Sequence, residues 1–220
     1  MMDPHAASPA LVTGVPLAEA TFALVMMHGR GDSPRGLLPL ARTVGALDGA
    51  VIIPHAGGNS WYPNRFRDPV ATNEPWLTSA LASMDRAVQS AIDADIPPHR
   101  IVLTGFSQGA CLALEYAWRT PRRYGAVAAL AGALIGDVRT VRRAAQSLDD
   151  TPVLLACGDA DAHIPESHVR DSAESMTVSG GIVDLRIYPG VGHTIVADQI
   201  EALRMLVDVV RASHRDDGIG

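Results

Sequence analysis

Short, dense runs of apolar residues alternate along the chain with longer stretches in which apolar residues recur every three or four positions. The dense runs lie at 21–28, 50–54, 100–106, 126–132, 151–158 and 183–189. Such runs are typical of strands buried on both faces of a parallel sheet. The stretches with helical spacing lie at 34–47, 74–94, 108–119, 137–148, 166–179 and 194–212. Repeated strand–helix units predict right-handed crossovers and an α/β fold, with a mostly parallel sheet flanked by helices on both faces.

The chain has 220 residues, which suits one α/β unit better than two small domains. The sequence contains no internal repeat, no low-complexity tract and no linker-like stretch. We therefore expect a single domain over 13–213, with a flexible N-terminus at 1–12 and a flexible tail at 214–220. The segment 133–151 is too short to hold a large lid domain.

One connection, from His55 to Pro75, is unusually long and has neither helical nor strand periodicity. Loops of this length in compact domains are usually functional or disordered. This one contains Trp61, Tyr62 and Phe66, although aromatic residues make up only 5% of the chain. Because disordered segments are poor in aromatics, the pattern predicts an ordered loop folded over another part of the protein.

The composition limits which cellular compartment and which classes of binding partner we expect. The formal net charge of −6 argues against a nucleic-acid surface, which needs a basic patch. Cys111 and Cys157 lie within apolar runs, which predicts buried thiols in a reducing compartment and no disulfide. The N-terminus has no apolar core of a signal peptide, and the longest apolar stretch, 124–136, is shorter than the roughly 20 residues that span a bilayer. We expect a cytoplasmic protein without integral membrane association.

The clearest chemical signal is G-x-S-x-G, formed by Gly105 to Gly109 around Ser107. It joins a predicted strand to a predicted helix, where a sharp turn exposes a nucleophile above the edge of the sheet. The glycines on both sides let strand and helix approach closely, and the helix N-terminus offers free N–H groups to a developing negative charge. Ser107 is therefore our candidate nucleophile.

A serine hydroxyl needs a base, and in this arrangement the acid and then the histidine follow the serine in the chain. Of the later histidines, only His193 comes directly after the last predicted strand, in YPGVGHTI. Ligands bind at that carboxyl edge of α/β sheets, so His193 is the candidate base.

The candidate acid lies in GDADAHIP, after the preceding strand. We prefer Asp161 to Asp159, because the carboxylate must reach the far nitrogen of the histidine and should lie past the turn. Asp159 is then a turn or capping residue. A metal site formed by Asp159, Asp161 and His163 is the alternative, but no fourth ligand stands at useful spacing.

The developing anion needs two main-chain donors. One is the N–H after the nucleophile, and the other comes from the loop after an early strand. Here these are the main-chain amides of Gln108 and of Arg30, the latter in MMHGRGDSP.

Taken together, HGRGD, NSWYPNRF, GFSQGACLALEYA, GDADAHIP and PGVGHTI resemble the phospholipase/carboxylesterase family of α/β-hydrolases, which includes acyl-protein thioesterases and small bacterial esterases. The resemblance covers about 20–212. It implies the α/β-hydrolase fold, with Ser107 as nucleophile, Asp161 as acid, His193 as base and main-chain donors at Arg30 and Gln108. No cofactor or metal is needed.

We therefore expect a serine hydrolase that cleaves carboxylic esters or thioesters of small soluble molecules through an acyl-enzyme. Trp61, Tyr62 and Phe66 are expected to line its pocket, although Trp61 suits a loop anchor equally well. Two alternatives stay open: a lactonase or dienelactone hydrolase-like enzyme acting on cyclic or aromatic esters, and a ligand receptor without activity. The sequence also leaves open whether the chain forms a homodimer.

Overall fold

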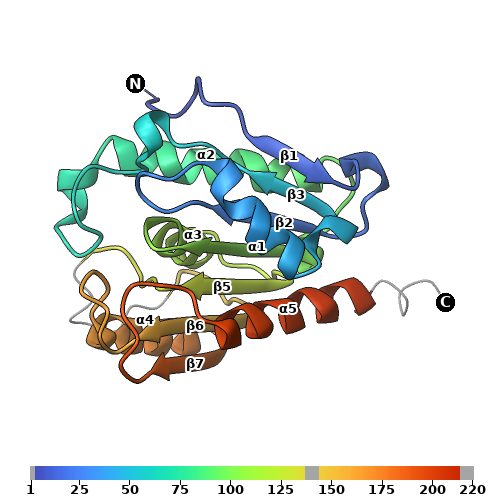
Figure 1. The fold of residues 1–220 in the computed structure, drawn as a ribbon. Helices are drawn as coiled ribbons and strands as arrows, with labels where there is room; N and C mark the ends of the chain where they lie inside the picture. Colours follow the sequence, from blue (N-terminus) through green and yellow to red (C-terminus); the bar gives the residue numbers. More distant parts are fainter. Residues whose placement is uncertain (1–2, 137–143, 214–220) are drawn as a thin grey trace.

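The computed structural model describes residues 3–136 and 144–213, and its centre is a sheet of seven strands. The strands are β1 (Leu11–Gly14), β2 (Ala23–Met27), β3 (Ala50–Ile53), β4 (Ile101–Phe106), β5 (Ala126–Leu130), β6 (Pro152–Gly158) and β7 (Ile182–Tyr188). Their order across the sheet is β1-β3-β2-β4-β5-β6-β7 (Figure 1). β2 to β7 run parallel, and β1 pairs antiparallel with β3. This is the expected α/β-hydrolase fold.

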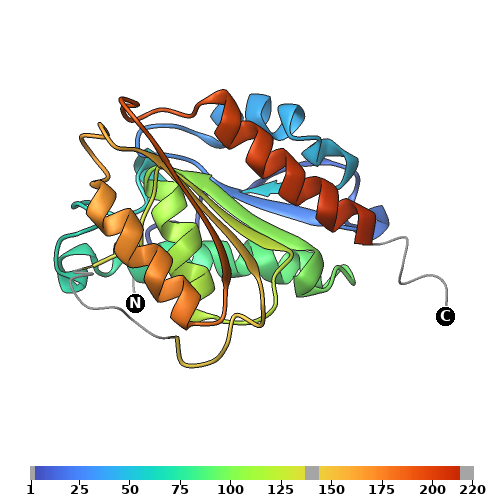
Figure 2. The same ribbon diagram turned by 90° about the horizontal axis from the view of Figure 1, so that it is seen from below.

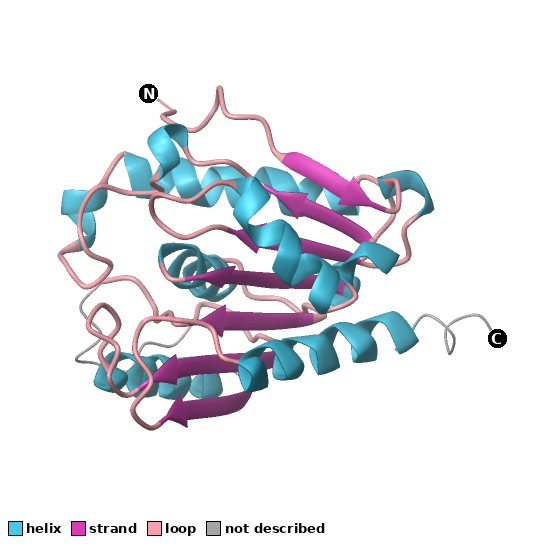
Figure 3. Ribbon diagram, in the orientation of Figure 1, coloured by secondary structure: helices cyan, strands magenta, loops and turns pink. Residues whose placement is uncertain are grey.

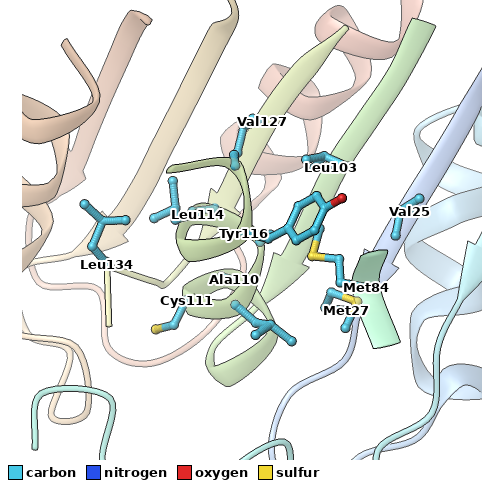
Figure 4. Close-up of a cluster of buried hydrophobic side chains, with 14 of the residues drawn as sticks. Val25, Met27, Met84, Leu103, Ala110, Cys111, Leu114, Tyr116, Val127 and Leu134 are labelled. Atoms are coloured by element: carbon cyan, nitrogen blue, oxygen red, sulfur yellow. The ribbon is translucent and has the colours of Figure 1, made fainter. Parts of the chain in front are cut away.

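Helices cover both faces of the sheet. α1 (Leu38–Thr43) and α5 (Ala197–Ala212) lie on one face, and α2 (Trp76–Ile92), α3 (Gln108–Arg119) and α4 (Glu166–Val178) lie on the other (Figure 2). Each face has its own cluster of buried apolar side chains. Figure 4 shows part of the larger cluster, where Leu103, Val127 and Leu114 pack between the sheet and α3. Burial of this apolar surface is the main free-energy gain that fixes the helices on the sheet.

All six dense apolar runs form strands, as predicted. The central ones explain the pattern, since every residue of β2 and of β5 is buried. β1 was not predicted. It has only four residues, and its burial alternates between half-buried and exposed positions, so it leaves no dense run in the sequence.

One of the predicted helices differs in the structure, and another lies largely outside the described residues. The stretch 34–47 contains two 3-10 turns and the short α1, because Pro34 and Pro39 each start a new turn and Gly45 ends the helix with a φ of 71°. Of the stretch 137–148, residues 137–143 lie outside the described residues, and 144–148 contain no helix.

Of the N-terminal stretch at 1–12 that was expected to be flexible, residues 3–12 are described, and part of this segment packs against the rest of the protein. The side chain of His5 is fully buried, and its main-chain N–H donates to Ser79 Oγ over 3.1 Å. Its ring nitrogens contact Trp61 O at 3.0 Å and Gly57 N at 2.9 Å. These contacts fix the segment against the long loop between β3 and α2 (Figure 3). The expected tail at 214–220 lies outside the described residues. Within the described ranges, no helix is long and apolar enough to cross a membrane.

Candidate active site

Ser107 lies in the turn between β4 and α3, at the carboxyl edge of the sheet. Its φ of 56° and ψ of −120° are unfavourable for a residue with a side chain. The neighbouring glycines explain how the turn fits. A Cβ atom on Gly109 would lie 2.0 Å from Met27 O, and one on Gly105 would lie 2.5 Å from the carbonyl carbon of Gly109. Strand, turn and helix can therefore pack this closely only with glycine at both positions.

The three side chains predicted from chain order, Ser107, Asp161 and His193, are connected by hydrogen bonds. His193, in the loop after β7, has Nε2 2.8 Å from Ser107 Oγ and Nδ1 2.7 Å from Asp161 Oδ2. With the ring proton on Nδ1, the imidazole donates to the carboxylate and accepts from the hydroxyl. This arrangement allows the imidazole to take the proton of Ser107 while the carboxylate stabilises the resulting cation.

The carboxylate of Asp161 is completely buried and well supplied with donors. Oδ1 accepts from the main-chain amides of His163 at 2.8 Å and Ile164 at 2.9 Å. Cys157 Sγ lies 3.6 Å from Oδ2, within reach of a weak S–H hydrogen bond. Burial alone would raise the pKa of Asp161, but the hydrogen bonds from His193 and from the two amides outweigh it and lower the pKa below its usual value.

Asp159 has the expected turn-forming position. Its Oδ1 accepts the main-chain N–H of Gly190 over 2.7 Å. Gly190 belongs to the loop that carries His193, so Asp159 fixes that loop from the neighbouring strand end. Among the described residues, no group of three or more histidine, cysteine and carboxylate side chains is placed to hold a metal ion.

The ring of His193 contacts two other rings. Its centroid lies 5.0 Å from that of Phe106 and 4.8 Å from that of His163, the latter edge to face. Sequence reasoning considered His163 only as a metal ligand and missed this contact. No periodic pattern could have indicated it, because the two histidines come from different loops.

The expected anion donors lie beside the serine. A Cβ atom built on Gly29 would be 3.7 Å from Ser107 Cβ, so the loop that continues into Arg30 passes next to the serine. The main-chain N–H groups of Arg30 and Gln108 have no acceptor within the part of the chain that the structure describes. They are thus available to an oxygen bound over Ser107.

The side chains of the same two residues hold the aromatic loop. The guanidinium of Arg30 donates to the carbonyls of Tyr62 at 2.8 Å, Pro63 at 2.9 Å and Asn64 at 2.7 Å. The amide of Gln108 accepts the N–H of Trp61 at 2.9 Å and donates to Tyr62 O at 2.8 Å. The two residues expected to supply the anion donors are therefore connected to this loop by five hydrogen bonds.

His28, just before this loop, was not singled out from the sequence, although it belongs to the HGRGD motif. It is fully buried, with Nδ1 2.8 Å from Gly29 O and Nε2 accepting from the N–H of Ala56 over 3.2 Å. Burial lowers the pKa of His28 below its usual value, which favours the neutral ring. Its hydrogen bond to Gly29 O orients the peptide whose nitrogen belongs to Arg30.

A cavity of about 760 Å³ opens over Ser107 and His193. Tyr62 and Phe66 line it, as expected, together with Arg30, Gln108, His163 and residues 63–68. Trp61 does not line it. Its side chain is fully buried, and its Nε1–H donates to His28 O over 2.8 Å. Trp61 thus anchors the loop beneath the cavity wall that residues 62–68 form. Its indole is surrounded by buried apolar side chains and donates to a buried carbonyl.

Comparison with known proteins agrees with this geometry. The family description "Phospholipase/Carboxylesterase" matches residues 12–210. The chain belongs to the phospholipase/carboxylesterase family. Membership of this family makes the chain a carboxylic ester hydrolase.

The chain resembles several known proteins. The crystal structure of a phospholipase/carboxylesterase from Dyadobacter fermentans superposes with a TM-score of 0.87 at 36% identity, over 91% of this chain and 96% of that one. Acyl-protein thioesterase 1 from Cryptococcus neoformans is 26% identical over 214 residues, which cover 84% of this chain and 90% of the relative. The Bacillus cereus carboxylesterase, at 18% identity and a TM-score of 0.71 over 93% and 95% of the two chains, shares the fold.

Proposed function

We propose that this chain hydrolyses carboxylic esters, or thioesters, of small soluble molecules through an acyl-enzyme on Ser107. The observation that carries the proposal is the bridging position of His193, 2.8 Å from Ser107 Oγ and 2.7 Å from Asp161 Oδ2. The relatives named as thioesterases and carboxylesterases support the same class of reaction.

The reaction would proceed in two symmetric halves. His193 takes the proton of Ser107 as Oγ attacks the carbonyl carbon, and the resulting oxyanion accepts from the amides of Arg30 and Gln108. His193 then protonates the leaving alcohol or thiol, which leaves the acyl group on Ser107. Water attacks this ester with His193 as base, and the carboxylic acid departs as Ser107 regains its proton. Asp161 holds the histidine tautomer throughout.

The compartment we propose is the cytoplasm. Cys111 and Cys157 are both free thiols. Burial raises the pKa of each to about 12, so neither forms a thiolate readily. Two unpaired, unreactive thiols suit a reducing environment.

The test combines labelling with a substrate series. A fluorophosphonate reagent should modify Ser107, as located by peptide mass spectrometry, and 4-nitrophenyl esters of increasing acyl length should be hydrolysed. Ser107→Ala should keep the circular dichroism spectrum and lose both reactions. Normal turnover in Ser107→Ala would reject the mechanism. Hydrolysis of lactones in preference to matched linear esters would favour the lactonase alternative, and a folded protein without labelling or turnover would favour the receptor.

A further inference from the structure

The wall of the cavity above Ser107 is positively charged. Its lining includes three arginines, Arg30, Arg65 and Arg67, and one carboxylate, Asp68. The chain as a whole has a formal net charge of −6, so this excess is local. A partly enclosed site lined by one sign of charge concentrates ions of the opposite sign.

Arg65 and Arg67 belong to a turn that the rest of the protein holds rigidly. Asp68 N donates to Arg65 O over 3.2 Å, and Asp68 Oδ2 accepts Arg65 N at 3.0 Å, so the turn is closed from both sides. The fully buried Asn73 donates to Arg65 O over 3.1 Å. Between the two arginines, Phe66 is buried, and its carbonyl accepts the N–H of Gly136 over 2.6 Å.

The guanidinium groups on this turn are unpaired in the part of the chain that the structure describes. Neither Arg65 nor Arg67 makes a side-chain hydrogen bond or ion pair within the described residues. Elsewhere in the chain, Arg119 pairs with Glu115, and Arg186 pairs with Asp184 and Asp198. Arg67 is half-buried, so its charge is less well solvated than that of a free surface arginine. The planar fork of a guanidinium matches the oxygens of a carboxylate or a phosphate.

We propose that the substrate carries, besides its ester bond, a negatively charged carboxylate or phosphate group, which Arg67 and Arg65 bind at the cavity wall. This inference rests on the proposed esterase function and specifies its substrate class. The rigid turn makes the recognition efficient, since little main-chain freedom is lost when the anion binds. A charged hydrogen bond of this kind should favour an anionic ester over its neutral analogue about tenfold.

The test compares matched esters that differ only in the remote group. For an anion on the acyl side, the mono-4-nitrophenyl ester of adipic acid is compared with the analogue whose free carboxylate is a primary amide. For an anion on the alcohol side, 4-acetoxybenzoate is compared with 4-acetoxybenzamide, each rate being divided by the rate with hydroxide. 4-Acetoxyphenyl phosphate distinguishes a phosphate from a carboxylate. The readout is the ratio of kcat/KM for the anionic ester to that for the neutral ester.

In the wild-type protein, at least one pair should give a ratio of about ten at low salt, which falls as NaCl screens the charges. Arg67→Gln should reduce that ratio most, Arg65→Gln less, and Arg67→Lys should retain part of it. Arg42→Gln is the matched control, because Arg42 is exposed on α1, on the other face of the sheet. It should keep the wild-type ratio.

Two results would overturn the inference. One is a ratio near or below one for every anionic ester in the wild-type protein. The other is a high ratio that persists when Arg65 and Arg67 are both replaced by glutamine, since the preference would then come from elsewhere. In either case, turnover of the neutral esters and labelling of Ser107 would show that the proposed esterase function itself stands. Loss of both reactions would instead reject that function.

Discussion

Arg30 and Gln108 donate hydrogen bonds to the same acceptor, the main-chain carbonyl oxygen of Tyr62, each over 2.8 Å. The two residues come from different elements, one from the loop after β2 and the other from the first turn of α3. Both line the cavity over Ser107, and the main-chain N–H of each has no acceptor among the described residues. The wall of the cavity and the proposed anion donors are therefore positioned by the same two side chains.

Arg30→Met should lower kcat/KM for esters by roughly tenfold or more, because the main-chain carbonyls of residues 62–64 lose their shared donor and the wall is no longer held. The main-chain N–H of residue 30 remains, so Arg30 acts as a positioning residue. Steady-state kinetics should place most of the loss in kcat for short esters and in both parameters for long ones. Arg35→Met, which removes an exposed arginine from the next turn, is the control. Unchanged kinetics in Arg30→Met would contradict this role.

Asp161→Asn should lower kcat by about 10⁴, since an amide cannot hold His193 in the tautomer that accepts the serine proton. The protein should stay folded, because the amide oxygen can still accept from the two main-chain N–H groups. Asp159→Asn is the matched control. Its side-chain oxygen can keep the contact with Gly190, and its kcat should stay close to that of the wild type. Equal losses in the two variants would count against Asp161 as the acid.

The buried histidines predict a fall in stability with acidification. Burial lowers the pKa of both His5 and His28, so the unfolded chain takes up protons at a higher pH than the folded one. The free energy of unfolding should therefore decrease as the pH falls below about 6.5, by at most about 1.4 kcal/mol per pH unit for each histidine, until the folded protein also takes up the protons.

Urea unfolding between pH 8 and pH 5 measures this slope. His5→Asn should be less stable than the wild type at pH 8, because it loses contacts with the loop, and should show a shallower slope below pH 6.5. An identical slope in the variant would contradict the assignment to His5.

Gly109→Ala should prevent stable folding or destabilise the protein by several kcal/mol, since the new Cβ would lie 2.0 Å from Met27 O. Gly192→Ala is a suitable control, because a Cβ there meets no atom within 4 Å. Thermal unfolding should show a large loss for the first variant and a small change for the second. A stable Gly109→Ala protein would mean that strand and helix can separate at this turn.

The sequence was sufficient to place Ser107, Asp161 and His193 at one edge of the sheet. Each follows the end of a dense apolar run, and the residues that follow parallel strands all lie at the carboxyl edge of the sheet. It also placed Arg30 and Gln108 at the same edge. These predictions depended on local patterns and on topology, both of which the sequence contains.

The remaining features depend on contacts between distant segments. His5 is buried against a loop more than 50 residues away, and nothing in its own neighbourhood indicates this. Trp61 was ambiguous for a related reason. Whether an indole faces a cavity or lies beneath its wall depends on an acceptor such as His28 O, whose position only the folded chain defines. The edge-to-face contact between His163 and His193 also joins two segments that are distant in the sequence, so no local pattern indicates it.

The wall is held through main-chain oxygens of Tyr62, Pro63 and Asn64, and any amino acid can supply such an oxygen. The exposed side chain at position 63 can therefore be exchanged without removing these bonds or disturbing the pair formed by Asp161 and His193, and an exchange at position 64 removes in addition only the hydrogen bond from Asn64 Nδ2 to Thr72 O. In descendants of this gene, as in a mutant library, new substrate preferences could arise at these positions while the chemistry is inherited unchanged.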